Sequence, residues 1–225
     1  MKKKIKISPS LMCADLSQLG EEVKKLEEAG ADSFHFDIMD NKFVPNITFG
    51  PDIVESLREK TFLPFEIHMM VYQPENLIEK FIKAGGNIII VHYEAVLYPY
   101  RILNELKNKN IKTGIAINPK TPVCCIEELI KEIDTVLVMC VEPGFAGGNF
   151  IPSSIKKIKE IKNIAEKVNS DLSIEVDGGV NEKTIPLLIK EGADIFVLGS
   201  TSIFREERDY KKRIKDIRKL IEKYL

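Results

Sequence analysis

The chain has 225 residues, a formal net charge of −1 at pH 7 and a hydrophobic content of 44%. This near-neutral charge gives no sign of a nucleic-acid or membrane partner, and no apolar run is long enough to span a bilayer. The length and composition fit one soluble globular domain, which is predicted to cover residues 1–225 around a single core.

Short apolar runs alternate with longer amphipathic stretches along the chain. The runs predict eight strands, at residues 5–8, 33–37, 65–69, 88–92, 112–117, 135–139, 173–177 and 195–198. The stretches between them have helical periodicity; residues 152–168 carry isoleucines at a spacing of three on one face. Alternating units predict a parallel sheet, and eight strands favour a single-domain (β/α)8 TIM barrel of the α/β class. An open doubly wound sheet is the alternative, although no GxGxxG motif follows the first strand.

Three similar tetrapeptides recur along the chain: AGAD at 29–32, AGGN at 84–87 and EGAD at 191–194. Each lies where a predicted helix ends and the next predicted strand begins. Their recurrence supports a chain built from βα units of similar construction.

The four cysteines are Cys13, Cys124, Cys125 and Cys140. No pair has the CxxC spacing of a redox or metal site, and a bridge between two neighbouring cysteines would be strained. Free thiols are the simplest interpretation, and they predict a cytoplasmic protein.

The three histidines of the chain all fall at the ends of predicted strands, where such barrels carry their active sites. His35 and Asp37 are two residues apart, so their side chains share one face of a strand. His68 and Asp177 end two other strands, and two imidazoles with two carboxylates predict one divalent ion, Zn, Mn, Fe(II), Co or Mg. His92 lies outside this set, and we expect it to be a hydrogen-bonded core residue.

Glycines cluster after the last three predicted strands, at Gly144, Gly147 and Gly148, at Gly178 and Gly179, and at Gly199. Glycine exposes backbone N–H groups and permits the positive φ angles that cradle an oxyanion. The loops after strands seven and eight are frequent phosphate sites in TIM barrels, assisted by a short helix, expected here at 200–204. The length and glycine content of residues 142–148 also predict a lid.

Three methionines, Met39, Met70 and Met139, also lie at strand ends. From their chemistry alone, packing in the core is the preferred interpretation.

These stretches together resemble the ribulose-phosphate 3-epimerase family over nearly the whole chain. The matching segments are SPSLMCAD at 8–15, HFDIMD at 35–40, FVPNITFG at 43–50, HMM at 68–70, VM at 138–139, EPGFAG at 142–147, EVDGG at 175–179 and GS at 199–200. The chain departs from the usual family pattern at Asn41 and Ala146, where glycine is usual.

The resemblance implies a metal ion held by His35, Asp37, His68 and Asp177, with the two aspartates as catalytic acid and base. It also implies that Met39, Met70 and Met139 line the site beside the metal, and that the enzyme forms homo-oligomers. The residues implied to contact a sugar phosphate are Ser10, His68, Gly144, Phe145, Ala146, Gly147, Gly178, Gly179, Gly199 and Ser200.

The predicted reaction is inversion at C3 of a phosphorylated ketose by two-base proton transfer, through a metal-stabilised cis-enediolate. The segments at 8–13, 144–147 and 200–204 resemble D-allulose 6-phosphate 3-epimerases, whereas those at 48–51 and 177–180 resemble the pentulose branch. The substrate pair is therefore D-allulose and D-fructose 6-phosphate, slightly preferred, or D-ribulose and D-xylulose 5-phosphate, or both.

Two other functions fit the predicted fold. A sugar-phosphate lyase or decarboxylase of the phosphate-binding barrel type would carry Asp-x-Lys-x-x-Asp, but Asp37 is followed by Ile38, Met39 and Asp40. A non-catalytic phosphosugar-binding barrel would need the glycine loops but not four metal-type side chains.

Overall fold

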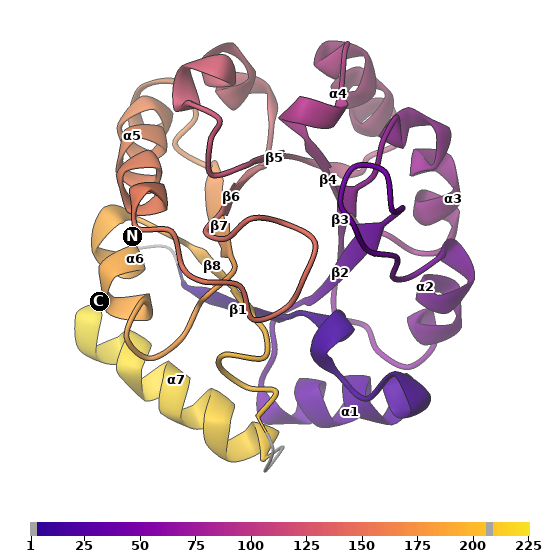
Figure 1. Ribbon diagram of the computed structural model, residues 1–225, viewed down its shortest axis with the longest axis vertical. Coiled ribbons are helices and arrows are strands. Elements are labelled where there is room, and N and C mark those ends of the chain that lie inside the picture. Colours follow the sequence, from indigo (N-terminus) through magenta and orange to yellow (C-terminus); the bar gives the residue numbers. More distant parts are fainter. Residues whose placement is uncertain (1–3, 206–208) are drawn as a thin grey trace.

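The computed structural model describes residues 4–205 and 209–225, and a ring of eight parallel strands forms its centre (Figure 1). The strands are β1 (Lys6–Pro9), β2 (Phe34–Met39), β3 (Phe65–Met70), β4 (Ile88–His92), β5 (Lys112–Ile117), β6 (Thr135–Met139), β7 (Ser173–Asp177) and β8 (Ile195–Leu198). They pair in the order β1-β8-β7-β6-β5-β4-β3-β2, and a parallel bridge between Ser10 and His35 joins β1 to β2. The predicted (β/α)8 TIM barrel is confirmed, and the doubly wound sheet is excluded.

The strand limits match the predicted ones closely. The five strands from β4 to β8 coincide with their predictions, and β1 is displaced by one residue. The strands β2 and β3 run further than predicted, to Met39 and Met70, which are paired in register. Because side chains alternate along a strand, this extension points both methionines to the same side as Asp37 and His68.

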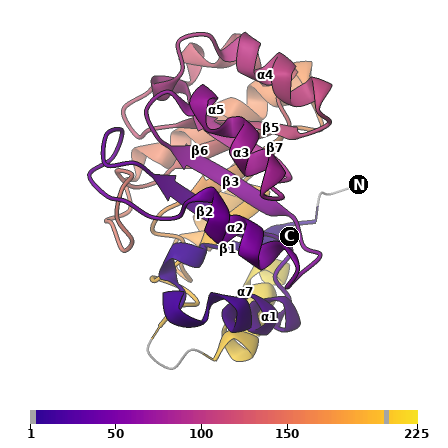
Figure 2. The same ribbon diagram turned by 90° about the vertical axis from the view of Figure 1, so that its right-hand side faces the viewer.

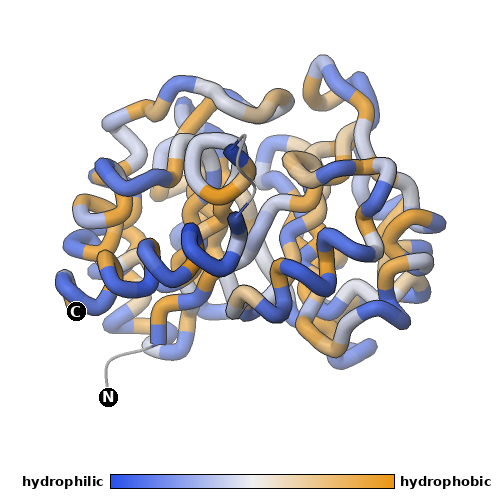
Figure 3. Tube along the Cα trace, turned by 90° about the horizontal axis from the view of Figure 1, so that it is seen from below, coloured by the Kyte–Doolittle hydropathy of each residue, from blue (hydrophilic) through white to orange (hydrophobic). Residues whose placement is uncertain are grey.

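Helices surround the ring (Figures 1 and 2), and hydrophilic and hydrophobic residues alternate along them (Figure 3). They are α1 (Leu19–Ala29), α2 (Pro51–Arg58), α3 (Ile78–Lys83), α4 (Pro99–Asn108), α5 (Ser153–Val168), α6 (Ile185–Glu191) and α7 (Tyr210–Tyr224). A 3₁₀ helix, Glu127–Glu132, takes the place of an α-helix between β5 and β6. The isoleucine stripe of α5 faces the core, as predicted: Ile158 and Ile161 are fully buried in the main core between helices and strands.

The interior of the ring has an apolar side and a polar side. The apolar side, on β4, β5, β6 and β8, packs Ile90, Ala116, Leu137, Met139 and Val197 together. The polar side, on β1, β2, β3 and β7, buries these residues: Ser8, His35, Asp37, Glu66, His68, Glu175 and, in part, Asp177. Buried carboxylates and imidazoles need partners or an ion, so the chemistry of the molecule lies on this side.

At the opposite end of the barrel, the recurrent tetrapeptides have a structural role. Their last residues accept hydrogen bonds from the backbone of a neighbouring strand: Asp32 from Ile7 N at 2.8 Å, Asn87 from Phe65 N at 2.8 Å and Asp194 from Ile174 N at 3.0 Å. Asp134, outside the repeats, accepts from Thr113 N in the same way at 2.7 Å. These hydrogen bonds join the starts of adjacent strands, and each tetrapeptide lies between the end of a helix and the next strand, as predicted.

One local expectation was wrong. Residues 200–204 form turns and a bend, not a helix, and the N–H groups of Ser202, Ile203 and Phe204 lie at hydrogen-bond distance from the carbonyl of Gly199. Across the described part of the chain, no helix is long and apolar enough to cross a membrane. The domain limits of 1–225 stay a prediction, since residues 1–3 and 206–208 lie outside the description.

Candidate active site

Alternation along β2 brings His35 and Asp37 into the barrel interior, where they are 0% and 3% exposed. Phe36, between them, packs outward, with its ring centroid 4.8 Å from that of Phe65. In the pairing of β2 with β3, Asp37 lies beside His68. The predicted shared face of His35 and Asp37 is therefore confirmed, and the neighbouring strand supplies the second histidine.

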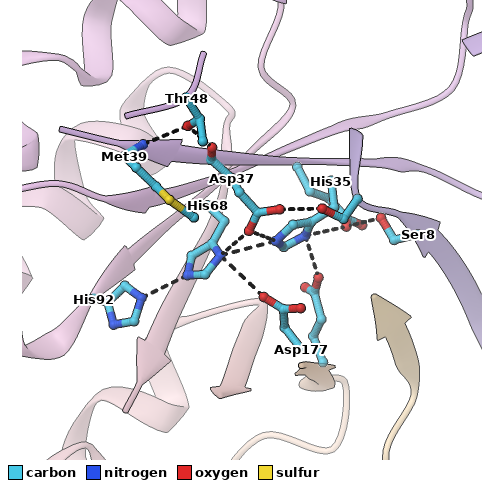
Figure 4. A network of polar contacts seen from close by, with 11 residues as sticks. Ser8, His35, Asp37, Met39, Thr48, His68, His92 and Asp177 are labelled. Atoms are coloured by element: carbon cyan, nitrogen blue, oxygen red, sulfur yellow. Dashed lines mark hydrogen bonds and ion pairs between the residues drawn. The ribbon is translucent and has the colours of Figure 1, made fainter. Parts of the chain in front are cut away.

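Four ligand-type atoms converge at the polar side of the barrel mouth (Figure 4). His35 Nε2 lies 3.2 Å from His68 Nδ1 and 3.4 Å from Asp37 Oδ1, and His68 Nδ1 lies 3.2 Å from Asp37 Oδ1. Asp177 Oδ2 completes the group at 3.8 Å from His68 Nδ1. Bonds of about 2.1 Å to one ion would separate tetrahedral ligand atoms by about 3.4 Å, so this set fits a divalent metal in size and in chemistry.

Charge and burial shift the pKa values of the two aspartates of this group in opposite directions. Although burial opposes it, the interactions with His35 and His68 hold the pKa of Asp37 well below its ordinary value. Burial and then the negative charge of Asp37 raise the pKa of Asp177 to about 7. The same pocket therefore holds one carboxyl that stays ionised and one that takes up a proton near neutral pH, as an acid and base pair requires.

The pKa values of the two histidines are also shifted by their surroundings. Asp37 raises the pKa of His35 well above its ordinary value, although burial opposes this. Burial lowers the pKa of His68 to about 3, so its ring is neutral at neutral pH. In the metal-free protein a proton on His35 thus supplies the positive charge that the carboxylates demand.

Behind His35 lies a second buried carboxyl pair that the sequence analysis did not single out. His35 Nδ1 is 3.0 Å from Glu175 Oε1 and 3.6 Å from Glu66 Oε2, and Ser8 Oγ donates to Glu66 at 2.5 Å. Burial and then the charge of Glu66 raise the pKa of Glu175 to about 8. Their spacing was the available signal, because Glu66 and Glu175 each lie two residues before a predicted ligand and so face the same way.

His92, at the end of β4, is a buried and hydrogen-bonded residue, as expected, but its partner is His68. The two Nε2 atoms lie 2.8 Å apart, and the rings stack with centroids 5.0 Å apart. The isolated position of His92 in the sequence gave no sign of this contact.

A pocket opens above the four-residue group. His35 and His68 are fully buried and do not line it, and Ser10 Oγ donates to Asp37 Oδ2 at 2.5 Å. All the other predicted site residues line it: Ser10, Asp37, Met39, Met70, Met139, Gly144, Phe145, Ala146, Gly147, Asp177, Gly178, Gly179, Gly199 and Ser200. The structure thus brings the two sets of predictions into one site.

The glycine side of this pocket is built from backbone. Gly178 and Gly179 have φ angles of +97° and +65°, and an added Cβ would meet Val141 at 2.4 Å and Phe150 at 2.9 Å. The loop between β6 and α5 passes over the barrel mouth (Figure 1), where the amide of Asn46 donates to the carbonyl of Gly144 at 2.9 Å. Here glycine is required by conformation and by space, as it is in the backbone cradles that bind anions in other proteins.

The three methionines lie at the wall of the pocket rather than deep in the main core. Met39 and Met70 form a small cluster with Val44, and Met139 belongs to the apolar side of the barrel interior. All three are buried in hydrophobic clusters, as the core-packing interpretation predicts, and they also line the pocket, which agrees with the role implied by the family resemblance.

Both departures from the usual family pattern fit the backbone. Asn41 has a φ of 58°, in the left-handed region that asparagine tolerates better than most residues. Ala146 is absent from the non-glycine residues of the described chain that have positive φ, so alanine fits there without strain.

The model of the ribulose-phosphate 3 epimerase family matches residues 6–204. The chain belongs to this family. It is therefore an epimerase, an enzyme of the isomerase class, and neither of the two alternative functions applies. The family resemblance inferred from the motifs is confirmed.

Proteins of similar sequence from three organisms carry the family's name. A ribulose-phosphate 3-epimerase of Bacillus subtilis is 47% identical over 215 residues, which cover 95% of this chain and 98% of that protein. One from Methanocaldococcus jannaschii is 44% identical, covering 95% and 90%, and one from Escherichia coli K12 is 40% identical, covering 94% of each.

Solved structures of low identity share the barrel. A tryptophan synthase α-subunit from Pyrococcus furiosus has a TM-score of 0.69 at 19% identity, covering 100% of this chain and 99% of that one. A thiamine phosphate pyrophosphorylase from the same organism has a TM-score of 0.67 at 17% identity, covering 99% and 98%. At this identity the likeness shows the fold alone.

Proposed function

We propose that this epimerase interconverts D-ribulose 5-phosphate and D-xylulose 5-phosphate at C3, with one divalent ion held by His35, Asp37, His68 and Asp177. The observation that carries the proposal is the 3.2 Å approach of His35 Nε2 to His68 Nδ1, beside two carboxylates, below a glycine-lined pocket. The ligand pattern supports an ion, because two ring nitrogens and two carboxylates that face one another need a shared cation. A bound ion would act as a Lewis acid toward the substrate's oxygens and make the proton on C3 easier to remove.

In the proposed reaction, Asp37 and Asp177 exchange protons with C3. They come from β2 and β7, which β1 and β8 separate in the ring, so one carboxylate can accept the proton from one face of the carbon while the other carboxyl donates to the opposite face. Their perturbed pKa values support unequal protonation, and Ser10 supports Asp37 by its hydrogen bond. Two interacting carboxyls of this kind titrate as a pair.

The remaining predicted residues would hold the substrate in place. Gly178, Gly179, Gly199 and Ser200 would bind the phosphate through backbone N–H groups and a hydroxyl, and the segment 144–147 would close over it. The sulfur atoms of Met39, Met70 and Met139 would exclude water from the reacting carbon without donating a proton to it.

The preference for a pentulose over a hexulose rests on the relatives. The three described above are named ribulose-phosphate 3-epimerases, whereas the sequence segments alone slightly favoured D-allulose 6-phosphate. D-allulose 6-phosphate stays a second candidate substrate. Homo-oligomerisation, a cytoplasmic location and the lack of a nucleic-acid or membrane partner stay predictions as well.

The test is to strip the purified enzyme with a chelator, confirm metal loss by elemental analysis and reload it separately with Zn²⁺, Mn²⁺, Fe²⁺, Co²⁺ and Mg²⁺. Turnover of D-ribulose 5-phosphate and D-allulose 6-phosphate is then compared for each form. We expect turnover to vanish on stripping, to return on reloading, and to have the higher kcat/KM for the pentulose. Full turnover by the stripped enzyme contradicts the metal, and a higher kcat/KM for D-allulose 6-phosphate contradicts the substrate.

A further inference from the structure

A chain of polar contacts leads away from the proposed metal site through His68. His68 Nε2 lies 2.8 Å from His92 Nε2, and His92 Nδ1 lies 3.2 Å from Glu94 Oε2 (Figure 4 shows the histidine pair). Both histidines are fully buried, so no water competes for these ring nitrogens. One proton must lie between the two Nε2 atoms, and the question is which ring carries it.

Glu94 determines which nitrogen of the His92 ring carries the proton. Its Oε1 accepts from Asn118 N at 2.8 Å and from the Thr121 hydroxyl, so Oε2 is left to face His92. Although burial opposes the shift, hydrogen bonds from His92, the Thr121 hydroxyl and Asn118 N lower the pKa of Glu94 to about 2. An ionised carboxylate only accepts, so His92 carries its proton on Nδ1 and presents a bare Nε2 to His68.

The position of the proton on His92 sets the position of the proton on His68, which belongs to the proposed metal site. Since His92 Nε2 accepts, the proton of neutral His68 is on Nε2, and His68 Nδ1 presents its lone pair to the ligand group. We call the contacts from Glu94 through His92 to His68 the relay. Without the relay, the tautomer of His68 with its proton on Nδ1 would be favoured, because Nδ1 lies 3.2 Å from Asp37 Oδ1 and could donate to it. That tautomer would place a hydrogen where the ion binds.

We propose that His92 and Glu94 are positioning residues that fix the tautomer of His68 and so keep its Nδ1 available as a metal ligand. The inference rests on the metal site of the proposed function and adds two residues to it. A carboxylate that orients a ligand histidine is a common support of metal sites, and its loss lowers metal affinity by about 10–100-fold. Here the support acts through a second histidine.

The test uses Glu94→Gln, which keeps the shape and removes the charge. Asn118 N and the Thr121 hydroxyl require the amide oxygen, so the amide NH₂ must face His92 Nδ1. The relay is then reversed, and His68 carries its proton on Nδ1. Titration of the stripped enzyme with Co²⁺, followed by visible absorption, should show affinity about 10–100-fold weaker than that of the unaltered enzyme. ¹⁵N NMR of the metal-free protein should show the His68 proton moved from Nε2 to Nδ1.

Two further comparisons separate positioning from folding. His92→Gln, whose amide oxygen can take the place of Nε2, should retain most of the Co²⁺ affinity, whereas His92→Leu should lose it. Glu127→Gln, the same change at an exposed position, should bind Co²⁺ like the unaltered enzyme.

The outcomes distinguish this inference from the function on which it rests. Unchanged Co²⁺ affinity and an unchanged His68 tautomer in Glu94→Gln overturn the relay and leave the metal site standing. If the unaltered enzyme binds no divalent ion, the metal site is overturned, and the relay with it.

Discussion

Carboxylates are buried or half-buried at both ends of this barrel, but their partners differ. At the mouth, Asp37 and Asp177 face histidines and one another across the proposed ion site. At the base, Asp32 and Asp194 accept hydrogen bonds from strand N–H groups, and Asp32 also pairs with Arg218. Fully satisfied carboxylates stabilise a fold, whereas carboxylates crowded together cost stability and supply reactivity. Changes at the two ends should therefore affect different measured quantities.

The largest expected effect is on turnover at the mouth. Asp37→Asn and Asp177→Asn keep the side-chain shape but remove a base, so each should lower kcat by roughly 10²–10⁴-fold. In the metal-free protein, Asp177→Asn should unfold at an equal or higher temperature, because burial and the charge of Asp37 raise the pKa of Asp177 and make its ionised form unfavourable. Asp37→Asn should unfold at a lower temperature, because it leaves His35 without its main counter-charge. Steady-state kinetics and calorimetry on the same preparations check these statements. Near-normal turnover by either variant would exclude the two-carboxyl mechanism.

The next largest effect is on stability at the base. Asp32→Asn removes a charge that binds Ile7 N, Arg218 and Lys4, and should lower the free energy of unfolding by about 1–3 kcal/mol. The value of kcat/KM should stay within about twofold, since the change is remote from the pocket. Urea unfolding with parallel kinetics measures the pair of quantities. A loss of turnover with no loss of stability would reverse the comparison between the two ends.

A smaller effect is expected from the backbone cradle. Gly179→Ala places a Cβ at a φ of +65° and 2.9 Å from Phe150, so the loop must shift. Strain of about 1–2 kcal/mol in the left-handed region should appear as roughly tenfold weaker substrate binding, mainly in KM. Gly50→Ala is the control, because its added Cβ meets nothing within 4 Å. An unchanged KM in Gly179→Ala would remove this glycine from the phosphate site.

The smallest expected effect is a pH dependence of the stability that Asp32 contributes at the base of the barrel. Although burial opposes it, hydrogen bonds from Arg218 and Ile7 N lower the pKa of Asp32 in the folded protein. A lowered folded-state pKa stabilises the fold above the unfolded value of about 4, and the stabilisation is lost as the pH falls through the folded value. The stability difference between the unaltered enzyme and Asp32→Asn should therefore narrow below about pH 4. A difference that widens on acidification would contradict this sign.

Much of the fold and of the candidate site could be predicted from the sequence, because they depend on the alternation of side chains along strands and on the order of the strands in the chain. The spacing of His35 and Asp37 fixed their common face, and the place of Gly178 and Gly179 after a strand indicated the cradle. Contacts between side chains of different strands could not be predicted in the same way. The approach of His92 to His68 depends on ring orientation across two strands, and the pairing of Glu175 with His35 depends on strands far apart in the chain.

The central claim is that two carboxyls on opposite sides of the substrate move the C3 proton, and isotope exchange tests it most directly. Epimerisation of D-ribulose 5-phosphate in D₂O is stopped at low conversion, and C3 of both sugars is examined by NMR. The product should carry deuterium at C3 from the first turnovers, because the donating carboxyl has exchanged with solvent, while the remaining substrate should carry little. Product that retains the substrate's own hydrogen at C3 would contradict the account.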